Sequence, residues 1–373
     1  MIKVRKQWWS ILLLVSLLAS AFVVPAGAAQ TDTERADTLK IAIPGPIEDP
    51  TNFNMTNWSA DRSRTGLHQF AYEYLFYDNL QTGEFIPWLA ESYEYNEDST
   101  ALTVKLREGV TWNDGEAFTA DDIVFTYDLM RENPSMSWAD VASAAVESVE
   151  MIDELTAQFN LAEANPRLHL NREAFPAVGI WGGITILPRH IWEGEDPLTF
   201  LNNPPVTTGP YVLADATQSS VTWTRNENWW VTDVFGVTPG PKTIQMLYLG
   251  AETNVALALV NDELDTPNIG ILSAGSFQEV ARRNENVRAW ETEAPYSWSD
   301  PCPRAMMVQN VTPGLETPEV RRAISHLIDR EAIVELAYEG TTVPAWGIWP
   351  EYDANQPYFE AIGDLREQYP NET

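Results

Sequence analysis

"TALTVKLREGVTWNDGEAFTADDIVFTYDLM" occupies residues 100–130 and changes its hydrophobic period halfway. In the first half, apolar residues alternate with polar ones at Leu102, Val104 and Leu106. This is the period of a half-buried strand, and turn signals follow it at residues 108–109 and 113–115 in a hairpin-like unit. In the second half, apolar residues recur at helical intervals, at Ile123, Tyr127 and Met130. The stretch therefore predicts a strand, a turn and a helix.

The acidic doublet Asp121-Asp122 in this stretch has three possible roles: a catalytic pair, a metal site or a helix start. Thr119 precedes Asp122 by three residues, which is the spacing of a capping box. Carboxylates in the first helical turn also complement the helix dipole and the free backbone N–H groups. The doublet is therefore assigned a structural role, and no catalytic residue is predicted.

Strands and helices are mixed along the rest of the chain without regular alternation. Strand patterns cover residues 38–43, 211–213, 221–224 and 242–250, and the second and third of these form a predicted hairpin. Helical patterns cover residues 252–265 and two further stretches that begin after Thr317 and Asp329. No internal repeat is found, so the chain is predicted to be α/β in the mixed, α+β sense.

Four segments, taken in order, resemble the extracellular solute-binding proteins of family 5, the dipeptide and oligopeptide receptors of ABC importers. They are "LAESYEYNEDSTALTVKLREGVTWNDGEAFTADDIVFTY", "TTGPYVL…TRNENWW", "ALALVNDELD" and "PEVRRAISHLIDREAIVELAYEG". The resemblance runs from about Leu39 to Pro350. Asn261-Asp262 departs from the serine-glycine of the family, but both residues tolerate a left-handed backbone.

The resemblance implies a type II periplasmic-binding-protein-like fold, with two lobes and an extra domain inserted in the first lobe. Lobe one is expected at residues 38–68 and 205–295, the inserted domain at 69–204, and the start of lobe two at 296–373. Family members are usually longer, so lobe two is expected to be incomplete and the chain truncated.

The start of the chain reads as a signal peptide, residues 1–29, with basic residues ahead of an apolar run and a small-residue triplet at 26–28. Its removal takes away three basic residues, so the formal charge falls from −31 to −34. Such a charge disfavours nucleic acid and anionic membranes as partners. No lipid-anchor cysteine follows the cut, and Cys302 is the one cysteine. A monomer that is periplasmic or extracellular is predicted.

The predicted ligand is a small peptide, delivered to a membrane permease and its ATPase. An oligosaccharide of the cellobiose kind is the alternative, because 13 of the 15 Trp lie outside the signal and Trp stacks on sugar rings. Trp112, Trp223 and Trp229 occupy predicted strand or hairpin positions, where packing in the core explains their presence. Residues in loops near the implied cleft are the predicted ligand-binding set: Asn57, Trp58, Trp298 and Trp346.

The sequence leaves two other classes of function open. A secreted glycosidase would need a pair of carboxylates about 5 to 10 Å apart, and no such pair stands out in the sequence. The second class is an inert remnant, which cannot close around a ligand. The four histidines have no metal-ligand spacing, so neither a metal nor a cofactor is predicted.

Overall fold

The computed structural model describes residues 35–171, 174–175, 183–268, 271–296, 304–345, 347 and 349–363. The predicted signal peptide, Cys302, Trp298 and Trp346 lie outside these ranges. The described chain is mixed α/β, as predicted. No helix in these ranges has the length and apolar character needed to cross a membrane.

The largest sheet formed by the described residues mixes parallel and antiparallel strands. Strand β1 pairs in parallel with β10 and β11, and β9 pairs in antiparallel fashion with β10 and β8. The order is β11-β1-β10-β9-β8, with β1 (Thr38–Ala42), β8 (Tyr211–Ala216), β9 (Ser220–Arg225), β10 (Thr243–Leu247) and β11 (Thr266–Pro267). The predicted strands at 38–43 and 242–250 and the predicted hairpin are therefore confirmed.

Each face of this sheet packs on its own apolar cluster, because successive side chains of a strand point to opposite faces. Ile41 and Ile43 pack on one face with Trp223, whose indole N–H donates to the Thr65 carbonyl at 2.7 Å. Ala42 packs on the other face with Val255. The covering helices are α2 (Arg62–Thr65) and α3 (Leu67–Phe70) on the first face and α8 (Glu252–Val260) and α9 (Ala274–Arg283) on the second.

A separate antiparallel sheet holds the opening stretch of the sequence analysis. Its order is β4-β5-β7-β6, with β4 (Ala90–Tyr95), β5 (Ala101–Leu106), β6 (Val146–Asp153) and β7 (Thr156–Leu161). Around it lie the hairpin β2 (Phe76–Asn79) and β3 (Glu84–Pro87), and the helices α4 (Ala120–Glu132), α5 (Ala139–Ala145), η1 (Leu168–Leu170), α6 (Arg189–Trp192) and α7 (Trp230–Phe235).

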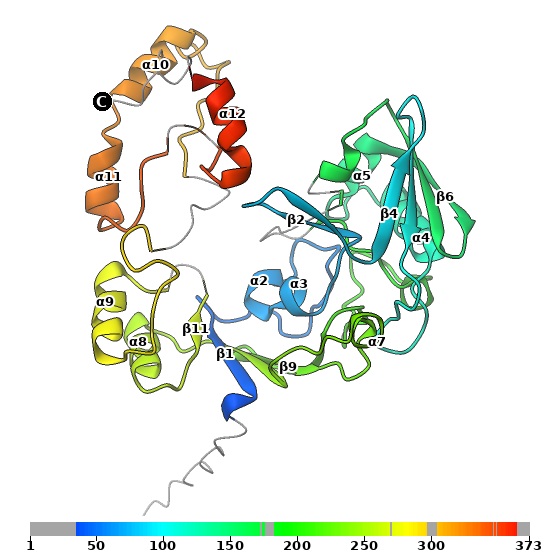
Figure 1. Cartoon of the computed structure of the whole chain (residues 1–373), viewed down its shortest axis with the longest axis horizontal. Coiled ribbons are helices and arrows are strands. Elements are labelled where there is room, and N and C mark those ends of the chain that lie inside the picture. Colours follow the sequence, from blue (N-terminus) through cyan, green and yellow to red (C-terminus); the bar gives the residue numbers. More distant parts are fainter. Residues whose placement is uncertain are drawn as a thin grey trace, which may run out of the picture.

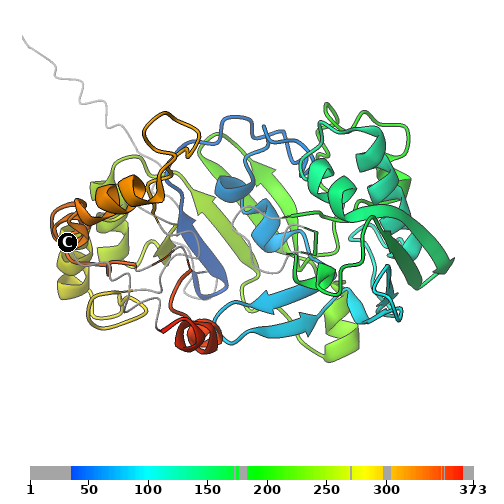
Figure 2. The ribbon, with the colours of Figure 1, turned by 90° about the horizontal axis from the view of Figure 1, so that it is seen from above.

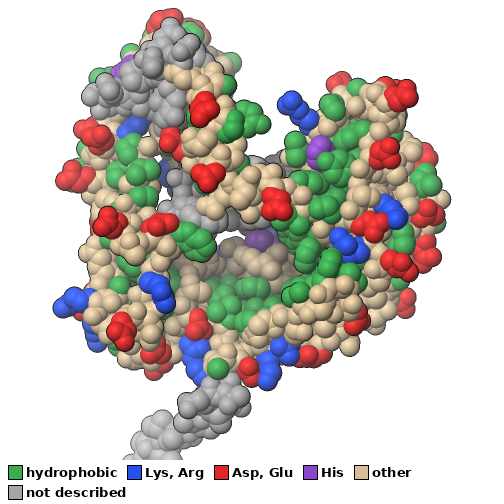
Figure 3. Space-filling view, viewed as in Figure 1, with side chains coloured by type: hydrophobic (Ala, Val, Ile, Leu, Met, Phe, Trp, Pro, Cys, Tyr) green, Lys and Arg blue, Asp and Glu red, His purple; other side chains and the backbone are tan. Residues whose placement is uncertain are grey.

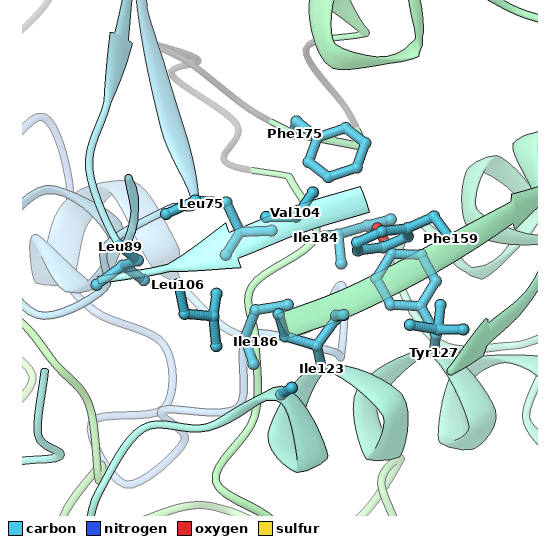
Figure 4. Packing of buried hydrophobic residues seen from close by; sticks show 14 of the residues in the cluster. Leu75, Leu89, Val104, Leu106, Ile123, Tyr127, Phe159, Phe175, Ile184 and Ile186 are labelled. Carbon is cyan, nitrogen blue, oxygen red and sulfur yellow. The ribbon is translucent and has the colours of Figure 1, made fainter. Parts of the chain in front are cut away.

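Helix α4 packs its apolar face against this sheet (Figure 4). Ile123 and Tyr127 point from the helix toward Val104 and Phe159, which come from β5 and β7. Each such side chain is fully buried and contributes about 1.5 to 3 kcal/mol by leaving water. A Thr111–Ala117 bridge closes the predicted turn at 113–115.

The segment after residue 304 carries short helices, of which the first two lie at the opposite end of the molecule from the four-stranded sheet and the last lies beside the β2–β3 hairpin (Figures 1 and 2). The helices are α10 (Pro318–His326), α11 (Arg330–Ala337), η2 (Asp353–Asn355) and α12 (Gln356–Ala361). Asp329 caps α11 by accepting from the Ala332 N–H at 2.8 Å, as predicted. Asp262 has φ 56, so the tolerated left-handed turn is also confirmed.

The capping box predicted at Thr119 is present. The buried Asp122 carboxylate accepts from the backbone N–H groups of Thr119 and Arg189, both at 2.9 Å. Asp121 points outward and forms an ion pair with the Arg189 guanidinium at 2.8 Å. The two adjacent carboxylates therefore have different tasks, one buried and one at the surface.

This difference gives a test of the structural assignment. Asp122→Ala should lower the free energy of unfolding by about 2 to 3 kcal/mol, because it leaves two enclosed backbone donors without their charged acceptor. Asp121→Ala, the matched control, should cost less than about 1 kcal/mol, because exposed ion pairs are weak. Urea unfolding of both variants measures the difference, and equal losses would contradict the assignment.

Candidate functional site

The surface of the molecule is hollowed at its centre, between the segment after residue 304 and the four-stranded sheet (Figure 3). We call this the central hollow. Strand β1 runs toward it, so the carboxyl ends of the parallel strands β1, β10 and β11 face it, with α2, α3 and the β2–β3 hairpin alongside (Figure 1). The hairpin meets the far segment where the Ala354 N–H donates to the Gln81 carbonyl at 2.8 Å. Carboxyl ends of parallel strands are where α/β proteins hold ligands.

Asn57, one of the predicted ligand-binding residues, uses its side chain inside the protein. Its amide nitrogen donates to the Leu198 carbonyl at 2.6 Å, and its amide oxygen accepts from the Ser59 N–H at 2.9 Å. These bonds fix the loop between β1 and α2 against the 196–203 loop. Contact of Asn57 with a ligand stays a prediction.

Trp58, the neighbouring residue, is different, because 58% of its surface is exposed. The Arg62 guanidinium carbon lies 4.5 Å from the centre of the Trp58 ring. The centre of the Trp138 ring lies 4.9 Å from the centre of the Trp58 ring, and the two ring planes are inclined by 62° to each other. An exposed indole therefore has a cation on one side and a second indole beside it. Trp298 and Trp346, the other predicted residues, lie outside the described ranges.

The arginine and the second tryptophan are held firmly. Arg62 is buried, and its Nη2 donates to the Met55 carbonyl at 2.8 Å and to the Ser137 hydroxyl at 2.7 Å. Trp138 has a left-handed backbone with φ 68, which costs a bulky residue about 1 to 3 kcal/mol. The Ser137 N–H donates to the Thr56 carbonyl at 2.7 Å and helps to hold this conformation.

A second hollow of about 600 Å³ lies beside α8 and α9. It begins at the carboxyl end of β11, and its lining includes Phe277, Trp290, Tyr296 and Thr341. The volume is in the range of small-ligand sites. Sequence reasoning did not identify this hollow, because its walls come from segments that are far apart in the chain.

Glu73 was also missed, and it is the most perturbed acid near the hairpin. Its carboxylate is 5% exposed and accepts from three indole N–H groups, those of Trp88 and Trp230 at 2.8 Å and of Trp229 at 3.2 Å. The Thr208 hydroxyl adds another bond. Burial nevertheless raises the pKa of Glu73 to about 7. The sequence signal was a lone acid in an aromatic run, "FAYEYLFY" at residues 70–77.

His68 lies next to the hollow on α3 and has a structural environment. It is buried, and its Nδ1 is 3.1 Å from the Arg62 carbonyl oxygen. Burial lowers the pKa of His68 to about 4, so the ring is neutral at physiological pH. Within the described part of the chain, no three His, Cys, Asp or Glu side chains gather as metal ligands would.

The mixed sheets place the chain in the α/β class, with a central hollow between its two ends, and the comparisons with known proteins agree with this fold. Residues 84–366 match the model of the bacterial extracellular solute-binding proteins, family 5 (middle region). The chain belongs to this family, as the sequence motifs predicted.

Two relatives match more than two thirds of this chain. Protein XP55 of Streptomyces lividans is 26% identical over 281 residues, which is 74% of this chain and 46% of the relative. A putative ABC transporter peptide-binding protein of Brucella ovis is 27% identical over 270 residues, 69% of this chain and 45% of the relative. The chain thus spans about half the length of the curated relatives it matches.

Solved structures share the shape of this chain. The periplasmic oligopeptide-binding protein of an oligopeptide ABC transporter from Thermotoga maritima has a TM-score of 0.76 and 28% identity, over 90% of this chain and 60% of that one. The same protein with mannohexaose bound has a TM-score of 0.70 and 27% identity, over 89% and 59%. The type II periplasmic-binding-protein fold is therefore correct.

The buried Glu73 predicts a pH dependence of stability. Its pKa is about 7 in the folded chain, against an ordinary value of 4.5, so the folded state holds the proton more tightly. The contribution of Glu73 to the free energy of unfolding is full below about pH 4.5 and is lost as the pH rises through about 7. The change is on the order of 3 kcal/mol. We expect Glu73→Gln to remove this component from the pH profile of urea unfolding.

The quantity compared is the difference in free energy of unfolding between wild type and variant at each pH, because the other carboxylates titrate alike in both. Glu94→Gln, an exposed acid on β4, is the control and should leave the profile unchanged. Parallel profiles for Glu73→Gln and wild type between pH 4.5 and 8 would show that Glu73 keeps an ordinary pKa.

Proposed function

We propose that this protein is the solute-binding component of an ABC importer, which captures peptides outside the cytoplasmic membrane and delivers them to a permease. The observation that carries the proposal is the likeness to the Thermotoga oligopeptide-binding protein over 90% of the chain. The central hollow, at the carboxyl ends of β1, β10 and β11, is the proposed ligand site.

An oligosaccharide is the second candidate ligand. The same Thermotoga protein is known with mannohexaose bound, so a protein of this shape holds a sugar chain. The exposed ring of Trp58 beside Trp138 suits a sugar as well as a peptide side chain. Asn57, Trp58, Trp298 and Trp346 remain the proposed contact residues.

The proposed mechanism is closure of two lobes around the ligand. Residues 38–68 and 205–295 form the first lobe, 69–204 an inserted domain and 296–373 part of the second lobe. The separate apolar clusters of the two large sheets support a division into two bodies, although Trp230 and Val231 of the first range pack with the four-stranded sheet. A ligand drives closure by binding the closed state more tightly than the open one, and the permease recognises the closed shape.

The protein acts, in this proposal, as an exported monomer that breaks no bond. The basic start and apolar run of residues 1–29 support export. The assignment of the Asp121-Asp122 doublet to a helix cap and an ion pair supports binding without catalysis.

Isothermal titration of the purified full chain tests the function. We expect saturable heat with a pool of short peptides, or with mannohexaose, and recovery of the ligand unchanged, because the site binds and does not react. Chromatography of the recovered ligand checks this point. Cleavage of a peptide or a glycoside that disappears when one carboxylate is replaced would establish an enzyme instead.

A further inference from the structure

Trp58, Arg62 and Trp138 form one rigid unit, which we call the Trp58 platform. Arg62 lies against one side of the Trp58 ring at 4.5 Å, and Trp138 flanks the ring at 4.9 Å with an inclination of 62°. More than half of the Trp58 surface still faces solvent. A large apolar ring is therefore presented outward on a fixed support.

The support is built before any ligand arrives. Arg62 cannot follow a moving ring, because its guanidinium is bonded to the Met55 carbonyl and the Ser137 hydroxyl. Trp138 is fixed in its left-handed backbone at the start of α5. Strained backbone conformations of this kind cluster at active sites and ligand clamps. Pre-organisation of this kind lowers the entropy cost of binding.

The buried cation restricts what can stack on the exposed part of the Trp58 ring. Arg62 already uses the negative π surface of Trp58, and a second cation stacked on the same ring would meet its positive charge. An uncharged ring meets no such penalty. It gains contact area with a rigid indole, as sugar rings and aromatic side chains do.

The platform also lies near the carboxyl end of β1. It belongs to the loop that follows the carboxyl end of β1 and leads to α2, and the carboxyl ends of the parallel strands are where the ligand site is proposed. Trp138 comes from the segment between α4 and α5, so the platform joins the neighbourhoods of the two large sheets.

From these contacts we infer that the Trp58 platform is a specificity-determining subsite that stacks one uncharged ring of the ligand. The ring is either a pyranose of an oligosaccharide or a Phe, Tyr or Pro side chain of a peptide. The inference rests on the proposed function and adds the class of group that the site selects.

The test compares the full chain with Trp58→Ala and Trp58→Phe by isothermal titration and by quenching of tryptophan fluorescence. The probes are mannohexaose, peptides that contain Phe or Pro, and peptides of Ala and Lys alone. Phe235→Ala is the matched control, because Phe235 on α7 is also exposed and has the Arg107 guanidinium 4.9 Å from its ring. Thermal unfolding of each variant verifies the fold.

Trp58→Ala should lower the affinity for the ring-containing ligand by about tenfold or more, since loss of an aromatic stacking contact has an effect of this size. Trp58→Phe should retain most of the affinity, and Phe235→Ala should retain all of it. An effect limited to mannohexaose assigns the ring to a sugar, and one limited to Phe or Pro peptides assigns it to a side chain.

Two results would overturn the inference in distinguishable ways. The subsite is wrong if the wild type binds a ring-containing probe and Trp58→Ala binds it equally well. It is also wrong if the substitution lowers the affinity for Ala-Lys peptides as much as for ring-containing ones. In both cases the importer function stands. If the wild type binds none of the probes, the proposed function fails and the subsite fails with it.

Discussion

The buried carboxylate of Glu73 is the constraint around which distant parts of the chain are arranged. Three indole N–H groups converge on it, from Trp88 after β3 and from Trp229 and Trp230 at the start of α7. A buried acid without such donors would be strongly unfavourable, so each donor must reach its place before the region is stable. The carboxylate thereby connects the hairpin beside the central hollow to the strands that end near residue 225.

Local patterns of the sequence were sufficient for most of the fold. The Thr119 capping box, the β8–β9 hairpin and the Asp329 cap were all predicted, because each depends on residues a few positions apart. The left-handed turn at Asp262 was readable for the same reason. Trp112, Trp223 and Trp229 are buried, as the strand and hairpin patterns indicated.

The candidate site was less predictable, because its contacts join residues that are distant in sequence. Trp58 and Trp138 are 80 positions apart, and nothing in either local pattern indicates that their rings meet. The amide of Asn57 donates to the carbonyl of Leu198, which is 141 positions away and is indicated by no local pattern. The three donors of Glu73 were hidden in the same way, although a single acid among aromatic residues is an observable sign of a buried charge.

The overall charge and the local site act on a ligand at different stages. A formal charge of −31 attracts cationic solutes toward the protein and repels anionic ones, which affects how often a ligand arrives. Contact within the site is governed by nearer groups, and Arg62 places a positive charge directly behind the Trp58 ring. On the proposed function, a peptide with both Lys and Pro residues would be attracted by its charge and bound through its uncharged ring. In the proposed site, the rate of encounter and the selectivity of binding would thus respond differently to salt, since salt screens the first far more than the second.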